Sequence, residues 1–223
     1  MSDMAGLQMQ MIQALKMPSD TTYKMLYSDE DYKFVSDQLA SSLGAGLEQV
    51  GAMKPAAIQL GVIARAYMKY FPNINLANTL DVRIQSDAAK EQKSVLGLET
   101  ADDQIYVLFG IMSLQRQADA LLCSLKNMDE LMALIPEQID AYNQCNLNKL
   151  YQQFKDDDGV CPSTPLENDA LYKDRNNAWM KKLPEMMKGK SSFIAVGALH
   201  LAGEYGLLNL LEKSGYKVEP VKL

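Results

Sequence analysis

Hydrophobic and polar positions follow the helical period through most of the chain. In SDEDYKFVSDQL, Ser28 is followed three residues later by Asp31, which is typical of a capping box, and apolar residues then recur every three or four positions. We expect a helix over 29–43, ended by the glycines of the following GAG. Pro55 suits the first turn of a second helix, which is apolar around most of its circumference and is therefore expected to be buried.

Further helical patterns follow in the middle of the chain. Thr100 is the expected N-cap of a helix of about 24 residues, with Asp103 completing a second capping box. A glycine- and proline-containing loop, DDDGVCPSTP, separates the last two long helical patterns. The other predicted helices cover about 79–92, 128–155, 166–188 and 201–215.

Three short segments predict β-strands: KSVLGLE at 93–99, SSFIAV at 191–196 and YKVEPV at 216–221. The last two flank a turn and a helix, and such units usually build parallel sheets with right-handed crossovers. The expected fold class is therefore α/β, a helix-rich α+β arrangement with an incomplete sheet of few strands and a large helical middle region. A stable sheet usually needs more strands, so we expect part of the sheet to lie outside this chain.

Length, composition and charge narrow the class of protein. The chain has 223 residues, of which 48% are hydrophobic, which fits one domain with a real core. Its net charge is −6 and its basic residues are scattered, so nucleic acid is not an expected partner. No apolar run is long enough to span a membrane, and the start, MSDMAGLQMQ, lacks the pattern of a signal peptide.

The three cysteines, Cys123, Cys145 and Cys161, do not form a CxxC pair, which argues against zinc-ribbon and thioredoxin sites. A disulfide between Cys145 and Cys161 is one interpretation in an oxidising compartment. Three ordinary thiols are the alternative.

Two polar residues follow predicted strands: Glu99 and His200, the only histidine. In open α/β sheets, ligands bind beyond the carboxyl ends of strands, and carboxylate and imidazole groups suit zinc or manganese. A metal-assisted hydrolase pair is one interpretation, and satisfaction of local turns is the other. Arg175 is a candidate anion clamp or an exposed helical arginine. Glu204 lies four residues after His200, but HLAGE is not the HExxH pattern, so we expect it only to support the site.

An ordered set of motifs resembles the TraB/GumN family, which includes the Tiki group of Wnt-cleaving metalloproteases. The motifs are LDVRIQSDAAKEQKSVLGLETADDQ, DRNNAWM and FIAVGALHLAGEYGLLNLLEKSGYKV. The resemblance spans about 80–223, and the helices of 1–79 fit the middle region of the family. It implies a fold similar to erythromycin-esterase and ChaN-like proteins, and a metal-dependent peptidase activity.

The resemblance also implies the site residues. The functional residues of the family are two GxxH motifs, a glutamate and an arginine. They carry over to Gly197 with His200, to Glu99 and to Arg175. The first GxxH of the family lies in an opening β-rich segment and has no counterpart here, because the chain has no second histidine. We therefore expect 1–223 to be a single domain that lacks this N-terminal segment and is inactive by itself.

For the full-length protein, the resemblance implies a divalent metal ion such as Mn, Co or Zn and a peptide or small-molecule substrate. It also implies an exported protein, periplasmic or lipoprotein-like. The alternative is a protein that retains a small molecule, peptide or haem in the same cleft without turnover. Unpaired sheet edges favour pairing between copies, so a homodimer is a further expectation.

Overall fold

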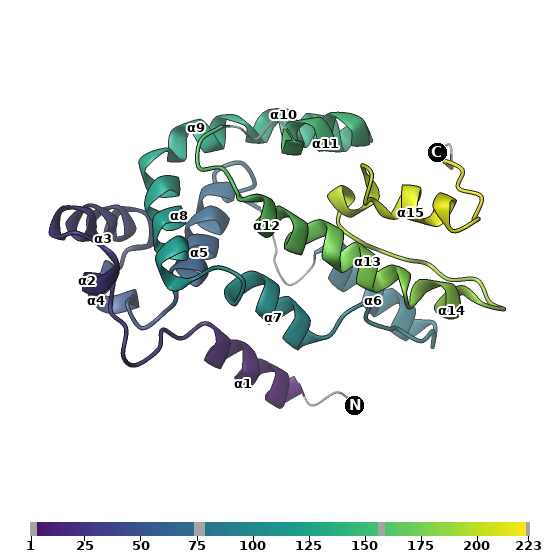
Figure 1. Cartoon of the computed structure of the whole chain (residues 1–223), viewed down its shortest axis with the longest axis horizontal. Helices are drawn as coiled ribbons and strands as arrows, with labels where there is room; N and C mark the ends of the chain where they lie inside the picture. Colours follow the sequence, from purple (N-terminus) through teal and green to yellow (C-terminus); the bar gives the residue numbers. More distant parts are fainter. Residues whose placement is uncertain (1–3, 74–78, 156–158, 222–223) are drawn as a thin grey trace. The chain divides into compact units, whose positions relative to one another are not determined.

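The structure, a computed structural model, describes residues 4–73, 79–155 and 159–221 (Figure 1). The helices pack into two compact units. The first unit comprises Met1–Ile74 and Ala101–Ala133, and the second unit comprises Asn75–Thr100 and Leu134–Leu223. All of the predicted site residues belong to the second unit.

The first unit is built from helices whose ends follow local sequence signals. The Ser28 side chain accepts a hydrogen bond from the Asp31 N–H, and Gly44 ends the same helix in the left-handed conformation, with φ of 78°. The predicted helix over 29–43 is thus confirmed, and Pro55 begins the next long helix as expected. The helices are α1 (Met4–Ala14), α2 (Tyr23–Leu26), α3 (Asp29–Leu43), α4 (Leu47–Val50), α5 (Pro55–Tyr67), α7 (Ala101–Phe109), α8 (Leu114–Lys126) and α9 (Met128–Ala133).

The core of the first unit lies between α3, α5 and α8, where aliphatic side chains are almost fully buried. The α5 helix presents a wide apolar face, as its pattern predicts, and packs against both partners. The buried aliphatic side chains that these three helices contribute to this core are Val35, Leu39, Ile58, Val62, Ala118, Leu121 and Leu125.

The long helix predicted from Thr100 is wrong, because the chain forms two helices, α7 and α8, instead. The Ser113 side chain accepts a hydrogen bond from the Arg116 N–H and so begins a new helix. The buried Gln117 amide donates to the carbonyl oxygens of Phe109 and Met112, which lie in the break. These bonds satisfy backbone groups that an unbroken helix would have paired internally.

The second unit contains α6 (Leu80–Lys90), α10 (Ile135–Asn143), α11 (Leu147–Lys155), α12 (Pro165–Asn168), the π-helix η2 (Asp169–Lys173), α13 (Asp174–Met180), α14 (Leu183–Met187), the 3-10 helix η3 (Ala198–Leu201) and α15 (Leu207–Lys213). A capping box begins α12, in which Thr164 and Glu167 satisfy each other's backbone N–H groups. Helices α12, η2 and α13 follow one another directly, so a π-turn lies within a longer helical run. A cluster of Trp179, Leu183 and Leu207 forms the core.

The expected sheet is not present, so the α/β prediction is wrong for the part of the chain that the structure describes. Within 4–73, 79–155 and 159–221, the β-pairing consists of one isolated bridge, between Lys16 and Met53. The segments at 93–99, 191–196 and 216–221 have the composition of strands, but none of them has a strand partner in the described part of the chain. A strand exists only when a neighbour takes up its backbone hydrogen bonds, and apolar composition cannot supply that neighbour.

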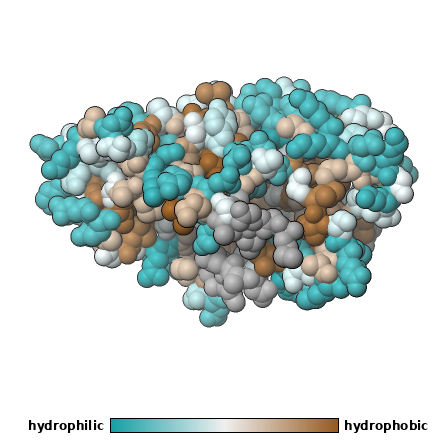
Figure 2. All heavy atoms as spheres, turned by 90° about the horizontal axis from the view of Figure 1, so that it is seen from below, coloured by the Kyte–Doolittle hydropathy of each residue, from teal (hydrophilic) through white to brown (hydrophobic). Residues whose placement is uncertain are grey.

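The surface combines hydrophilic residues with scattered hydrophobic ones, as the face drawn in Figure 2 shows. Among the described helices, none is long and apolar enough to cross a membrane.

Cys145 is an exposed free thiol. The disulfide between Cys145 and Cys161, which was one interpretation of the sequence, is therefore not formed.

Candidate functional site

Glu99, Arg175 and His200 meet in one cluster, although 76 and 25 positions separate Arg175 from the other two. Arg175 lies on α13 and donates to both carboxylate oxygens of Glu99, from Nε at 2.9 Å and from Nη2 at 2.6 Å. Its Nη1 lies 3.2 Å from Nε2 of His200, which belongs to η3. Arginine is thus the centre of this group, which we call the Glu99–Arg175–His200 cluster.

One face of the helical run 165–180 supplies Arg175 and three side chains that lie around the cluster. Tyr172, Arg175, Asn176 and Trp179 are spaced three, four and seven positions from the first, so they share that face. Tyr172 lies in the π-turn, directly before α13. π-turns within helices occur often at functional sites because they redirect the side chains around them.

Asn176 determines the protonation of the His200 ring. Its side-chain nitrogen donates to the carbonyl oxygens of His200, at 3.0 Å, and Tyr205, at 2.6 Å. Carbonyl oxygens only accept hydrogen bonds, so these two contacts fix which side of the Asn176 amide is the nitrogen. The Asn176 Oδ1 atom therefore faces His200 Nδ1, at 2.7 Å. Nδ1 therefore carries the proton, and the lone pair of Nε2 accepts from Arg175. The structure thus holds His200 as a neutral ring with both nitrogens engaged.

Burial and charge keep His200 neutral. The residue is 7% exposed, and its ring centroid lies 4.5 Å from that of Trp179 and 5.4 Å from that of Tyr172. Burial, and after it the positive charge of Arg175, lower the pKa of His200 to about 4, although the negative charge of Glu99 acts in the opposite direction. Burial also raises the pKa of Tyr172. At neutral pH the cluster therefore contains one ion pair and one uncharged imidazole.

The ion pair of Glu99 with Arg175 is largely shielded from water. The Glu99 side chain is 9% exposed and that of Arg175 is 23% exposed. Trp179 donates its indole N–H to Glu99 Oε2 at 3.2 Å, and the guanidinium lies 5.0 Å from the centre of the Trp179 ring. Arg175 Nη1 also donates to the Leu171 carbonyl oxygen. Such a pair depends on these extra hydrogen bonds, because desolvation offsets much of its attraction.

Of the two supporting residues predicted from sequence, Gly197 lies next to His200, whereas Glu204 has an exposed side chain. Gly197 directly precedes η3, and its carbonyl oxygen accepts from the His200 N–H at 2.9 Å. Its φ of −59° is ordinary, and a Cβ there would touch only the His200 ring, at 3.6 Å, so neither backbone nor space demands glycine. Glu204 has an exposed side chain and is not among the residues that contact the cluster.

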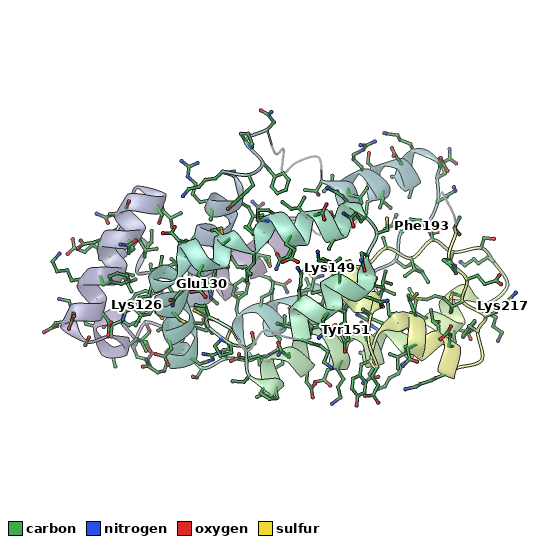
Figure 3. All side chains as sticks on the ribbon, turned by 90° about the horizontal axis from the view of Figure 1, so that it is seen from above. Lys126, Glu130, Lys149, Tyr151, Phe193 and Lys217 are labelled. Atoms are coloured by element: carbon green, nitrogen blue, oxygen red, sulfur yellow. The ribbon has the colours of Figure 1, made fainter. Side chains whose placement is uncertain are left out.

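Gly203, which the sequence did not single out, is the glycine that the packing does require. Its φ is 80°, and a Cβ would lie 2.2 Å from the ring of Tyr151, a residue of α11 labelled in Figure 3. Only glycine combines this backbone conformation with such a close approach. The segment after His200 is therefore held against α11.

The cluster as arranged does not fit a divalent metal ion. Among the described residues there is no group of three or more histidine, cysteine, aspartate or glutamate side chains that could hold one. Both oxygens of Glu99 accept from Arg175, and the Nε2 lone pair of His200 points at the same guanidinium. A fixed positive charge 3.2 Å from this nitrogen would repel a cation.

Fold and site together define a helical protein whose second unit has a buried carboxylate, guanidinium and imidazole joined by hydrogen bonds. The chain belongs to the TraB/PrgY/gumN family, whose model matches residues 1–220. The resemblance seen in the motifs of 80–223 is thus confirmed, and it extends over the helices that precede them. Neither the curated proteins nor the solved structures include a match.

Three residues of the site were missed by sequence reasoning: Tyr172, Asn176 and Trp179. A signal was present, because all three share a helical face with Arg175 in YKDRNNAW. An arginine on the same face as two aromatic residues and an amide is more easily explained as buried than as exposed.

Proposed function

We propose that the chain carries the Glu99–Arg175–His200 part of a hydrolase site that acts on peptides, and that the chain by itself is inactive. One observation carries the proposal. Three residues that the family resemblance selected, in separate motifs, are joined by direct hydrogen bonds in the second unit. A group assembled in this way from distant positions is typical of a functional site.

The chemistry of each residue supports a role. The Arg175 guanidinium provides the positive charge that would hold a substrate carboxylate or a developing oxyanion. Glu99 fixes the plane of that guanidinium through two hydrogen bonds. Asn176 fixes the His200 tautomer, so that Nε2 presents its lone pair toward the arginine.

The same geometry supports inactivity of the isolated chain. The Nε2 lone pair is already engaged by Arg175, and a pKa of about 4 makes His200 a weak base at neutral pH. A site for Mn, Co or Zn would need Arg175 to release Nε2 and further ligands from outside the described residues. The proposal also includes an exported setting and a homodimer.

A second candidate is a binding protein that retains its ligand without turnover. The specific observation in its favour is that both ring nitrogens of His200 and both oxygens of Glu99 are paired within the cluster. Such a paired site resembles a rigid recognition surface more than a reactive centre.

The test compares wild type, His200→Ala and Arg175→Met for zinc, manganese and cobalt content after equilibrium dialysis and for hydrolysis of a fluorogenic peptide library. We expect wild type to hold no stoichiometric metal and to cleave no peptide. Arg175→Met frees Nε2 and the carboxylate, so we expect it to bind zinc at least tenfold more tightly than wild type. Arg65→Met, an exposed arginine on α5 of the first unit, is the matched control.

Three outcomes would decide against the proposal. Peptide cleavage by wild type that disappears in His200→Ala would overturn the inactivity. Zinc binding by Arg175→Met that persists in the double variant Arg175→Met/His200→Ala would remove His200 from the site. Retention of a peptide or small molecule that weakens in His200→Ala, with no cleavage in any variant, would support the binding protein instead.

A further inference from the structure

A cavity of about 650 Å³ lies in the first unit, among the C-terminal parts of α3, α5 and α8 and the start of α9. All of its lining residues belong to the first unit, whereas the Glu99–Arg175–His200 cluster belongs to the second. Small-molecule sites commonly have volumes of about 300–1,000 Å³ and often lie between packed helices. The cavity is therefore large enough for a small organic molecule.

The buried part of the cavity lining is apolar. Val62, Ala66 and Leu125 line it, and only 3%, 7% and 7% of these residues are exposed. Met68 and Met128 are half-buried and also belong to the lining. Methionine side chains are flexible and adapt to the shape of a neighbour. This part of the cavity suits the apolar portion of a ligand.

Charges of both signs complete the lining. Arg65 and Lys69, four positions apart, come from the C-terminal end of α5. Asp129 and Glu130, the latter labelled in Figure 3, come from the first turn of α9. All four residues are exposed, and within the described ranges none of them forms an ion pair or a side-chain hydrogen bond. The charges of α5 and α9 line one cavity without pairing with each other.

This set of charges selects the class of ligand. Lys126 also lines the cavity, but its ammonium is already paired with Asp31 at 2.9 Å. A ligand with only negative charge would be repelled by the carboxylates of α9, and one with only positive charge by the cations of α5. A ligand that carries both charges is attracted to both helices, because each of its ends meets an opposite charge that is otherwise bound only to water.

We propose that this cavity binds a small zwitterion whose carboxylate and ammonium groups are separated by an apolar chain. The cations of α5 hold the carboxylate, the carboxylates of α9 hold the ammonium, and the chain covers the buried apolar lining. The two charges of the ligand must be separated, because the charges of α5 and α9 do not lie close enough to form an ion pair. The inference is independent of the hydrolase proposal, since the two sites lie in different units.

The test titrates the whole chain with octanoate, octylammonium and aminooctanoate, whose amino group is on the terminal carbon. Isothermal titration calorimetry measures the three affinities. We expect aminooctanoate to bind about fivefold more tightly than either single-charge probe, because an exposed ion pair contributes up to about 1 kcal/mol. In the ¹⁵N-labelled chain, we expect aminooctanoate to shift the amides of 62–69 and 125–130 and to leave those of Arg175 and His200 unchanged.

Variants of the lining check which charge meets which end of the ligand. Lys69→Met should weaken aminooctanoate and octanoate about threefold without weakening octylammonium, and Glu130→Gln should weaken aminooctanoate and octylammonium about threefold without weakening octanoate. Ala66→Leu fills the cavity and should weaken all three probes. Circular dichroism checks that each variant is folded, and the two exposed charge variants keep the test valid if Ala66→Leu is not. The control is Lys33→Met, an exposed lysine of α3 that is paired with Asp37 and does not line the cavity.

Several results would overturn the inference. They are equal affinities of the three probes, an absence of amide shifts in the cavity at millimolar aminooctanoate, or an effect of Lys33→Met equal to that of Lys69→Met. Octanoate binding as tightly as aminooctanoate would make the cavity an anion site instead. Shifts confined to Arg175 and His200 would assign the zwitterion to the second unit. Loss of all three probes alike in Lys69→Met and Glu130→Gln would show that the two charges only maintain the structure.

Discussion

Replacement of Arg175 by methionine should destabilise the second unit strongly. Methionine keeps most of the length and the apolar stem of arginine but removes the guanidinium. The change deletes two hydrogen bonds to Glu99 and one to the Leu171 carbonyl oxygen, and it leaves His200 Nε2 without its donor. A carboxylate with a side chain only 9% exposed then remains without its counter-charge.

The expected cost is large because the remaining charge is buried. Breaking a buried pair by removing one partner costs about 3–5 kcal/mol, against a total stability of about 5–15 kcal/mol for a typical domain. In the double variant Glu99→Gln/Arg175→Met the charge is gone as well, so we expect it to recover at least 1 kcal/mol of that loss. The interaction is then measured as the non-additivity of the cycle.

The assay is urea unfolding followed by fluorescence of Trp179, the single tryptophan, which lies in the second unit beside both residues. The control is Lys188→Met, because Lys188 and Glu185 form an ion pair with side chains 75% and 82% exposed. We expect this control to leave the free energy of unfolding unchanged. A loss below about 1 kcal/mol for Arg175→Met, or one equal to the control, would refute the buried-pair argument.

Three further predictions concern pH and packing. The pKa of His200 is about 4 in the folded chain and near 6.5 in the unfolded chain. Below pH 6.5 the unfolded chain therefore binds a proton that the folded chain does not, and the free energy of unfolding falls by up to about 3 kcal/mol as the pH falls toward 4. Urea unfolding at pH 7 and 4.5 should show this loss in wild type but not in His200→Gln. Gly203→Ala should cost about 1–3 kcal/mol more than Gly215→Ala in thermal unfolding, because both have positive φ but only the first Cβ meets a ring. Gln117→Leu should cost about 1–3 kcal/mol in the same assay by leaving buried backbone groups unpaired; an unchanged midpoint would contradict this.

Helix ends were the features most readily predicted from sequence. Ser28, Gly44 and Pro55 act on backbone groups within one helical turn, so their effect does not depend on the rest of the chain. The long helix expected after Thr100 was wrong for a different reason. Gln117 takes up carbonyls from the break and also bonds the Ala56 N–H, a partner 61 positions away that periodicity does not reveal.

The site shows the same difference between what local sequence predicts and what depends on residues far apart in the chain. The sequence by itself determined which residues were candidates, because the family motifs select Glu99, Arg175 and His200. It also determined the helical face that Arg175 shares with Asn176 and Trp179. Only the tertiary structure decided that these residues meet, that the imidazole is neutral, and that the extended segment before it has no strand partner among the described residues. Helices complete their hydrogen bonds within their own sequence, whereas strands, buried ion pairs and pKa values depend on neighbours that distant parts of the chain bring together.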